Sequence, residues 1–488
     1  GGANGDHGGE RSREEREKEE GVVEIAAAPL LSRSEEDLPD NDPRKMGVPA
    51  HRSEDSESPR WRRRKKHMFI VSSAGKPIFT RYGDEDALNP MFGVMCTLVS
   101  FFVEDQDDMP RVVLAGDHKI VFLIRGPVYL IMVSRTQEPT AHLARQLQFV
   151  YTQLVSILTR KGLERVFKKR SNFDLRNLLG ASGEQVLSNL VGAMDAHKLS
   201  SNLPLHSAIS FVFGAPHCAR LSLSVRSQVN KALLSVQSPN LIYAILLART
   251  QLVQFVRPRK TALWAEDLLL VVNLVNSSSS FRESEGTWTP LCLPLYSPDA
   301  NVFAYICFLH KHQAPDVCLV LVTSSDDEFF SLAESKDKIA DVLHNSGALA
   351  RIQDAANHPP FLVEEVQAAP FSISKELLHF VYFSTSMNQF IAPGFSPPFW
   401  SRQAKQRLLR QYQAVSHWVH RQQARVQHKV LLVNWETEAV FAWVDRDCEL
   451  YLALDPLTTR ASALAICNRL LRWVRAQEAT LFITPQMW

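Results

Sequence analysis

The chain has 488 residues, a formal net charge of +2 and 22% charged residues, an ordinary globular balance. Its length suggests about two to four domains, and its small net charge argues against binding nucleic acid by bulk attraction. Seven scattered cysteines without CxxC spacing fit reduced core thiols and exclude a zinc ribbon or a CxxC redox motif. No apolar run approaches a bilayer span, so we expect a cytoplasmic protein with only peripheral membrane contact.

Residues 1–60 are predicted to form a disordered tail of acidic and mixed charge. Ser34, Ser53 and Ser56 have carboxylate neighbours and are candidate sites for acid-directed kinases, although a solvated spacer explains the same composition. An apolar island at 22–31 is either a docking motif or a chance cluster. The globular part is expected to begin directly after this tail.

The first globular segment, 61–180, opens with a β-hairpin followed by a helix. Two β-rich runs, at 67–71 and 78–82, flank a turn that contains Gly and Pro. Asn89 followed by Pro supplies an N-cap and a first helical position, and the apolar residues from Met91 onward predict a helix. Three strands and an amphipathic helix complete the order strand, strand, helix, three strands, helix.

The same order of elements recurs at 365–488, which indicates internal repetition. The run that starts at His379 aligns without gaps on the run that starts at His67, with matching apolar positions and turn. A helix, three strands and a closing amphipathic helix follow it, as in the first segment.

The middle segment, 205–358, is interpreted as a more divergent copy. Strands are predicted at 208–213, 241–248, 252–256, 302–309 and 317–322, and helices at 223–236, 265–275 and 328–348. Helices packed on antiparallel sheets are a common layered arrangement. The predicted fold class is therefore α/β, with three α/β/α sandwich domains after the tail.

The chain carries no complete catalytic or metal-binding motif. Gly75-Lys76 lacks the first glycine and the hydroxyl residue of a phosphate-binding loop. His310 and His312 have no third ligand nearby in the sequence, so a surface pair is expected rather than a metal site. We therefore expect no covalent catalysis, no metal and no cofactor.

Two features favour binding. The helix after the first hairpin is apolar on more than one face, so it needs a cover besides its own sheet, either a partner chain or a neighbouring module. The run Arg62, Arg63, Arg64, Lys65 and Lys66 is a candidate contact for an anionic membrane, where each cation is worth about 1 kcal/mol. A solvated strand entry and a nuclear-import signal are the alternatives.

The segment 66–83 resembles the opening of the Mon-one vacuolar fusion proteins, as do 125–130, 146–148 and 288–294. The resemblance extends over about 61–488. It implies three longin-type domains, each an α/β/α sandwich. It also implies obligate pairing with a Ccz-one-type longin subunit in an exchange factor for the late-endosomal Rab-seven GTPase, recruited by the Rab-five GTPase and by phosphoinositide membranes.

The resemblance implies one subunit of a heterodimeric guanine-nucleotide exchange factor, on late endosomes and lysosomes or vacuoles, in endosome maturation, fusion and autophagy. Such a factor needs no general acid or base, because it acts by displacing the switch segments of the GTPase. Candidate contacts for the GTPase or the partner are Ser73, Gly75, Lys76, Pro77, Asn89, Met91, Phe92 and Met95. Ordinary turn and core positions would explain the same residues. A non-catalytic scaffold or tether, a related exchange factor for lysosome-related organelles, and a further regulatory subunit stay open.

Overall fold

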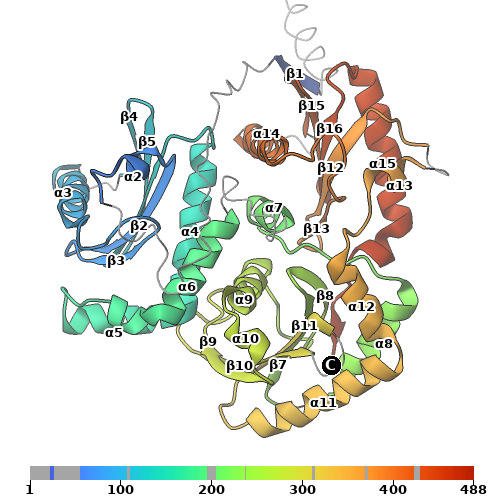
Figure 1. Ribbon diagram of the computed structural model, residues 1–488, viewed down its shortest axis with the longest axis horizontal. Helices are drawn as coiled ribbons and strands as arrows, with labels where there is room; N and C mark the ends of the chain where they lie inside the picture. Colours follow the sequence, from blue (N-terminus) through green and yellow to red (C-terminus); the bar gives the residue numbers. More distant parts are fainter. Residues whose placement is uncertain are drawn as a thin grey trace, which may run out of the picture. The chain divides into compact units, whose positions relative to one another are not determined.

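The computed structural model describes residues 22–26, 55–106, 110–194, 205–236, 238–309, 314–368, 372–421 and 429–488 (Figure 1). These residues fall into two compact units. One unit contains residues 55–358 together with 483–488, and the other contains 359–482 together with the strand at 22–26. Three largely antiparallel sheets with helices against them confirm the predicted α/β class.

The first domain is a five-stranded sheet in the order β3-β2-β6-β5-β4, with all neighbours antiparallel. Its elements are α2 (Pro59–Arg63), β2 (Lys66–Ser72), β3 (Pro77–Thr80), α3 (Asn89–Gln106), β4 (Val112–Ala115), β5 (His118–Arg125), β6 (Val128–Ser134), α4 (Thr140–Leu158), α5 (Arg160–Lys169) and α6 (Arg176–Met194). The predicted succession of hairpin, helix, three strands and amphipathic helix is confirmed.

Alternate residues of this sheet supply two separate cores, because successive side chains of a strand point to opposite faces. Phe69 of β2 and Phe122 of β5 pack beneath α3. Met68 and Ile70 of β2 point the other way and pack with α4. The apolar stripe predicted for α4 faces this second core, with Leu143, Leu147, Val150 and Leu154 buried and Ile157 half-buried. The helices α3 and α4 therefore cover opposite faces of one sheet.

The second domain repeats this strand order and adds an edge strand from the end of the chain, giving β17-β8-β7-β11-β10-β9. Its elements are α7 (Leu205–Phe213), α8 (Leu223–Leu234), β7 (Leu241–Ala248), β8 (Gln251–Arg257), α9 (Ala265–Ser277), α10 (Ser280–Glu283), β9 (Thr287–Leu291), β10 (Val302–Leu309), β11 (Ala314–Thr323), α11 (Phe329–Asn345), α12 (Ala348–Asn357) and β17 (Gln486–Met487). β17 runs parallel to β8. The middle segment is therefore a copy of the first domain, as predicted.

Three details of the middle segment differ from the prediction. Residues 208–213 belong to helix α7 rather than to a strand, because a short apolar run fits a buried helix as well as a strand. The single helix predicted at 328–348 is divided by Gly347, which adopts a left-handed φ of 70° between α11 and α12. Strand β9 was not predicted, because it is an edge strand containing Pro290.

The third domain forms its own unit, with the strand order β1-β14-β15-β16-β12-β13. Its elements are β1 (Val22–Ala26), α13 (Val363–Gln367), β12 (Leu377–Ser384), β13 (Gln389–Ile391), α14 (Arg402–Arg421), β14 (Lys429–Asn434), β15 (Ala439–Val444), β16 (Cys448–Leu454) and α15 (Arg460–Leu481). The repeat predicted from the His379 run is confirmed by the same order of strands and helices as in the first domain.

Part of the predicted tail is a strand. β1 pairs in parallel with β14, with Val22 opposite Val430, so 22–26 of the apolar island dock on the chain's own third sheet. The prediction of disorder therefore does not hold for these residues. The tail at 1–21 and 27–54 lies outside the described residues.

The first two domains share an interface within their unit. Asn273 of α9 donates a hydrogen bond to Gln153 Oε1 of α4 at 2.9 Å. Arg160 of α5 holds the Asp299 carboxylate through two hydrogen bonds of 2.9 Å. These contacts use α4 and α5 of the first domain. The helix α3 lies on the opposite face of the first sheet and takes no part in them.

Candidate interaction surface

The turn of the first hairpin is fixed by its own backbone and by a neighbouring turn. Gly75 adopts a φ of +77°, which favours glycine, and its N–H donates to the carbonyl of Ser72 at 2.9 Å. The Ser73 N–H donates to a carbonyl of the β5–β6 turn at 2.8 Å. Ser73 and Lys76 are exposed, whereas Pro77 is buried. The turn is thus a fixed loop that presents Ser73 and Lys76 to solvent.

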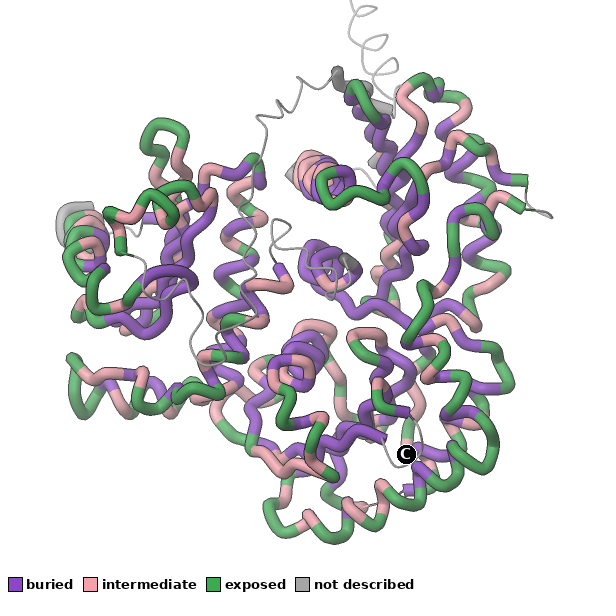
Figure 2. The backbone as a smooth tube through the Cα atoms, viewed as in Figure 1, coloured by how far each residue is buried: buried purple, intermediate pink, exposed green. Residues whose placement is uncertain are grey.

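Helix α3 buries one face and exposes another. Phe92 is fully buried, its ring centroid lies 5.6 Å from that of Phe69, and Met95 packs in the same core. On the outer side, Val94 is 71% exposed and Phe101 is 54% exposed. Figure 2 colours this helix by residue burial, with exposed and half-buried residues among buried ones. Complete burial of such a side chain contributes about 1.5–3 kcal/mol. Contact with a partner that covers this face would therefore stabilise the complex.

The structure divides the predicted helix contacts into two groups. Phe92 is a fully buried core residue that supports the helix, so the prediction that it contacts a partner is corrected, and Met95 packs in the same core. Asn89 is exposed and Met91 is half-buried at the start of the helix. Val94 and Phe101 carry the excess apolar surface instead. Their spacing of seven residues, two helical turns, places them on one face and is the signal that identifies them. We call the surface formed by Val94 and Phe101 the outer stripe.

Lys66 is not available to a membrane, which corrects that part of the prediction. Its Nζ lies 2.7 Å from Glu138 Oε1, and both side chains are 3% exposed. Gln146 Nε2 donates to Glu138 Oε2 at 2.7 Å, and Thr136 Oγ1 donates to Glu138 Oε1 at 3.2 Å. A buried charge needs such partners. Lys66 alternates with His67 along β2, so its side chain points to the α4 face of the sheet.

The other cations of this run differ in exposure. Arg62 pairs with Glu57, Arg63 is exposed and Lys65 is half-buried. The Arg64 guanidinium lies 3.8 Å above the ring of Tyr82. The run therefore contains structural residues as well as accessible ones.

A more uniform basic surface lies on α5 and the residue after it. Its exposed cations are Lys161, Arg165, Lys168, Lys169 and Arg170. Leu163 and Phe167 anchor the inner side of this helix in the core. An amphipathic helix with a basic outer face is typical of contact with anionic surfaces. The signal in the sequence is the pair of apolar residues Leu163 and Phe167, four positions apart among the cations of 160–170.

Among the predicted phosphorylation sites, only Ser56 falls within the described residues; Ser34 and Ser53 lie outside them. The Ser56 side chain is in a half-buried residue, and its carbonyl accepts a hydrogen bond from Arg62 Nε at 2.9 Å.

Asp267, at the start of α9, is the fully buried carboxyl of the second domain. Burial raises its pKa to about 6, and hydrogen bonds from the N–H groups of Leu295 and Tyr296, at 3.1 and 3.0 Å, oppose this shift. The carboxyl anchors the loop that follows β9. Its hydrogen-bond donors are backbone N–H groups, so we assign this carboxyl a structural role.

Across the described part of the chain, no group of three or more His, Cys, Asp or Glu side chains is placed to hold a metal ion. In the same residues, no helix is both long and apolar enough to cross a bilayer. His310 and His312, which were expected to form a surface pair, lie outside the described residues.

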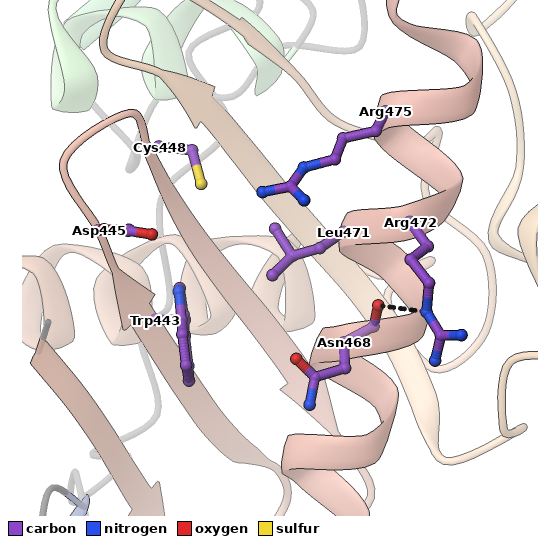
Figure 3. Close-up of a pocket in the computed structure, with 7 residues that line it drawn as sticks. All are labelled: Trp443, Asp445, Cys448, Asn468, Leu471, Arg472 and Arg475. Atoms are coloured by element: carbon purple, nitrogen blue, oxygen red, sulfur yellow. Dashed lines mark hydrogen bonds between the residues drawn. The ribbon is translucent and has the colours of Figure 1, made fainter.

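A hollow of about 440 Å³ lies between α15 and the β15–β16 hairpin of the third domain (Figure 3). It is lined by Trp443, Asp445, Cys448, Asn468, Leu471, Arg472 and Arg475. Arg475 extends from α15 toward the strand that carries Cys448, whereas Arg472 turns away and donates from Nε to the Asn468 carbonyl at 3.3 Å. Desolvation raises the pKa of the Cys448 thiol, so the hollow offers no activated nucleophile.

Comparison with protein families matches each domain separately. The model described as the first longin domain of FUZ, MON1 and HPS1 matches residues 66–190. The second longin domain of the same proteins matches 239–341, and the third matches 376–478. The three matches coincide with the three sheets described above.

Curated relatives are similar over most of their length. Protein SAND of Takifugu rubripes is 38% identical over 432 residues, which cover 88% of this chain and 78% of that protein. Vacuolar fusion protein MON1 homolog A of Bos taurus is 35% identical over 475 residues, covering 95% and 81%. The MON1 homolog of Arabidopsis thaliana is 34% identical over 466 residues, covering 90% and 73%. The chain therefore belongs to the MON1 vacuolar fusion protein family, the Mon-one family that its sequence resembles, whose members carry three longin domains.

Proposed function

We propose that this chain is one subunit of a heterodimeric guanine-nucleotide exchange factor for a Rab-seven-type GTPase, acting in endosome maturation and in fusion with the lysosome or vacuole. Its relatives are named vacuolar fusion proteins, which supports the role in fusion. The observation that carries the proposal is the outer stripe of α3. Val94 and Phe101 remain exposed there, although the opposite side of the helix packs on the sheet through Phe92, Met95 and Val99. Exposed apolar patches on a rigid element are typical of protein interfaces.

A Ccz-one-type longin subunit is the proposed partner of the first domain. Beside the outer stripe, this domain offers the edge strand β4, whose outer backbone groups are unpaired within the sheet. Val112 and Leu114 on β4 are 40% and 72% exposed. A second longin domain has its own helices and strand edges, so it can cover apolar helix surface and extend a sheet in one contact.

The proposed mechanism needs no chemical step on the nucleotide. Nanomolar to picomolar nucleotide binding corresponds to about 12–16 kcal/mol, and the factor must stabilise the nucleotide-free GTPase by a comparable amount. Packing against the switch segments can supply this, because those segments contact the phosphates and the metal only in the nucleotide-bound form. The accessible turn residues Ser73 and Lys76, beside α3, are the proposed contacts with the GTPase.

Membrane recruitment is proposed to be peripheral, on late endosomes and on lysosomes or vacuoles. The exposed cations of α5 support contact with a phosphoinositide-bearing bilayer better than the Arg62–Lys66 run does, because Lys66 is buried. A Rab-five GTPase is the proposed protein recruiter.

The test is release of a fluorescent nucleotide from a Rab-seven GTPase in solution. With a Ccz-one-type subunit bound, the chain is expected to accelerate release by several orders of magnitude, and alone it is expected to be almost inactive. A scaffold or tether would bind the partner and leave the release rate unchanged, which would refute the exchange function.

A further inference from the structure

The face of the first sheet beneath α3 is not covered along its whole length. The helix packs on Phe69 and Phe122, whereas the start of β2, the start of β5 and the end of β6 contribute His67, Ile120 and Val133 to the lining of a cavity. A pocket of about 450 Å³ remains there, in the size range of small ligand sites. Ala115, the exposed last residue of β4, also lines it. We call this cavity the entry pocket, because it lies where the chain enters β2.

The floor of the entry pocket is apolar and aromatic. Met91 and Met95 line it from α3, and Ile120 and Val133 line it from the sheet. Trp61 of α2 closes one side. Thioether and aromatic side chains make a surface that adapts to an inserted apolar group.

His67 adds an unsatisfied polar atom to this floor. Its ring lies 4.0 Å from that of Trp61, centroid to centroid, and the residue is only 6% exposed. A hydrogen bond to the Trp61 backbone holds the ring, whereas Nδ1 is buried without a hydrogen-bond partner. Burial, with the charges of Arg64, Arg81 and Arg135, lowers the pKa of His67 to about 3, so the ring is neutral. A neutral ring whose other nitrogen donates leaves Nδ1 as an acceptor that needs a donor.

The rim of the entry pocket is positively charged. Arg62, Arg64, Lys65 and Arg135 all line it. Arg135 Nη2 donates to the carbonyls of Arg62 and Arg64, at 2.6 and 3.2 Å, which fixes the approach to β2 around the cavity. These hydrogen bonds hold the backbone at Arg62 and Arg64 in place, so the cations stay at the rim of the cavity.

We propose that the entry pocket binds an acidic peptide segment of a protein partner. An apolar side chain of the peptide fills the floor, a neighbouring carboxylate meets the basic rim, and a backbone N–H donates to His67 Nδ1. This site is separate from the outer stripe, because it is lined by the sheet-facing side chains of α3 rather than by Val94 and Phe101.

A peptide fits these observations better than a lipid surface does. The cavity is concave and its polar atom lies at the apolar floor, which a flat bilayer does not reach. A phosphodiester supplies acceptors, whereas His67 Nδ1 requires a donor. A peptide with alternating acidic and apolar residues supplies the carboxylate, the apolar group and the N–H within a few residues.

The test is fluorescence anisotropy on the full chain with a labelled peptide, Asp-Glu-Phe-Asp-Leu-Glu-Asp, and with its Asn/Gln counterpart. Saturable binding of the acidic peptide alone is expected. Ala115→Trp, at an exposed lining residue, should remove saturable binding by filling the cavity, and Lys65→Gln should weaken it about threefold. Arg165→Gln, an exposed cation on α5, is the charge-matched control and should leave binding unchanged. Thermal melting of each variant confirms that it is folded.

Vesicles of phosphatidylserine and phosphatidylcholine form the second arm of the experiment. Loss of peptide binding in Ala115→Trp and Lys65→Gln, with unchanged binding to vesicles, supports the proposal. It is overturned if the peptide does not bind saturably, if both variants bind it like the parent chain, or if these variants reduce vesicle binding instead. Nucleotide release is measured separately, so its failure would not be confused with failure at this pocket.

Discussion

The buried ion pair between Lys66 and Glu138 provides the sharpest stability prediction. Replacing Glu138 with Ala removes the carboxylate and leaves the Lys66 ammonium, 3% exposed in the parent chain, without its partner. It also removes the acceptor of the hydrogen bonds that Gln146 and Thr136 donate to this carboxylate. The same reasoning identifies Lys66 as a structural residue of the first domain.

The expected cost is large compared with surface substitutions. Removing one member of a buried ion pair destabilises proteins by about 3–5 kcal/mol, because the remaining charge stays desolvated. Replacing both members with apolar residues avoids this penalty and is often close to neutral. We therefore expect the single variant Glu138→Ala to lose most of the stability of the first domain, and the double variant Lys66→Met with Glu138→Leu to recover most of it.

Hydrogen exchange followed by mass spectrometry is the assay, since it reports the opening free energy of β2 and β6 separately from the other domains. Both strands should lose protection in Glu138→Ala and regain it in the double variant. Arg63→Ala is the control, because Arg63 is an exposed cation three residues before Lys66. This variant should leave the protection of both strands unchanged. A loss below about 1 kcal/mol in Glu138→Ala, or a double variant as unstable as the single one, would refute the reasoning.

Three further predictions concern the second domain, the first hairpin and α5. The native pKa of Asp267, about 6, exceeds its ordinary value of 3.8, so folding takes up a proton and stability falls by about 2 kcal/mol as the pH rises from 4 to 6; Asp267→Asn should flatten this dependence in denaturant titrations. Gly75→Ala should destabilise the first domain by about 1 kcal/mol in denaturant titrations, because a residue with a Cβ is strained at the φ of +77° that Gly75 adopts. Lys168→Ala with Lys169→Ala should reduce flotation with anionic vesicles on the order of tenfold, and added salt should remove the difference.

Each of these predictions has a clear contrary result. An unaltered pH profile in Asp267→Asn would mean that this carboxyl is not the group that titrates. An equally stable Gly75→Ala would contradict the fixed turn. If Arg62→Ala with Arg63→Ala reduces flotation more than the α5 variant does, the basic run of the sequence, rather than α5, is the membrane contact.

The sequence predicted the three copies of the fold because their periodicity is strong and their turns carry Gly and Pro. It failed at α7, where an apolar run at 208–213 has no period that separates a buried helix from a strand. It also missed β9, because proline is atypical of strands and this one lies at an edge. These failures concern segments whose structure is determined by tertiary packing.

The candidate surface was only partly predictable for a related reason. The sequence showed that α3 is apolar on more than one face, but it did not show which face the sheet covers. Phe92 and Met95 face the sheet, whereas Val94 and Phe101 face outward. Lys66 was assigned to the solvent because Glu138, its partner, is 72 residues away in the chain. Long-range pairing of this kind is invisible to local composition.

Nucleotide release by the paired complex, with and without Phe101→Asp, tests the central claim most directly. The parent chain and its longin partner should release nucleotide from a Rab-seven GTPase rapidly. Phe101→Asp should abolish both partner binding and release, while Phe330→Asp, at a 78% exposed phenylalanine of the second domain, should retain both. Rapid release by the Phe101→Asp complex, or no release by the parent complex, would contradict the account.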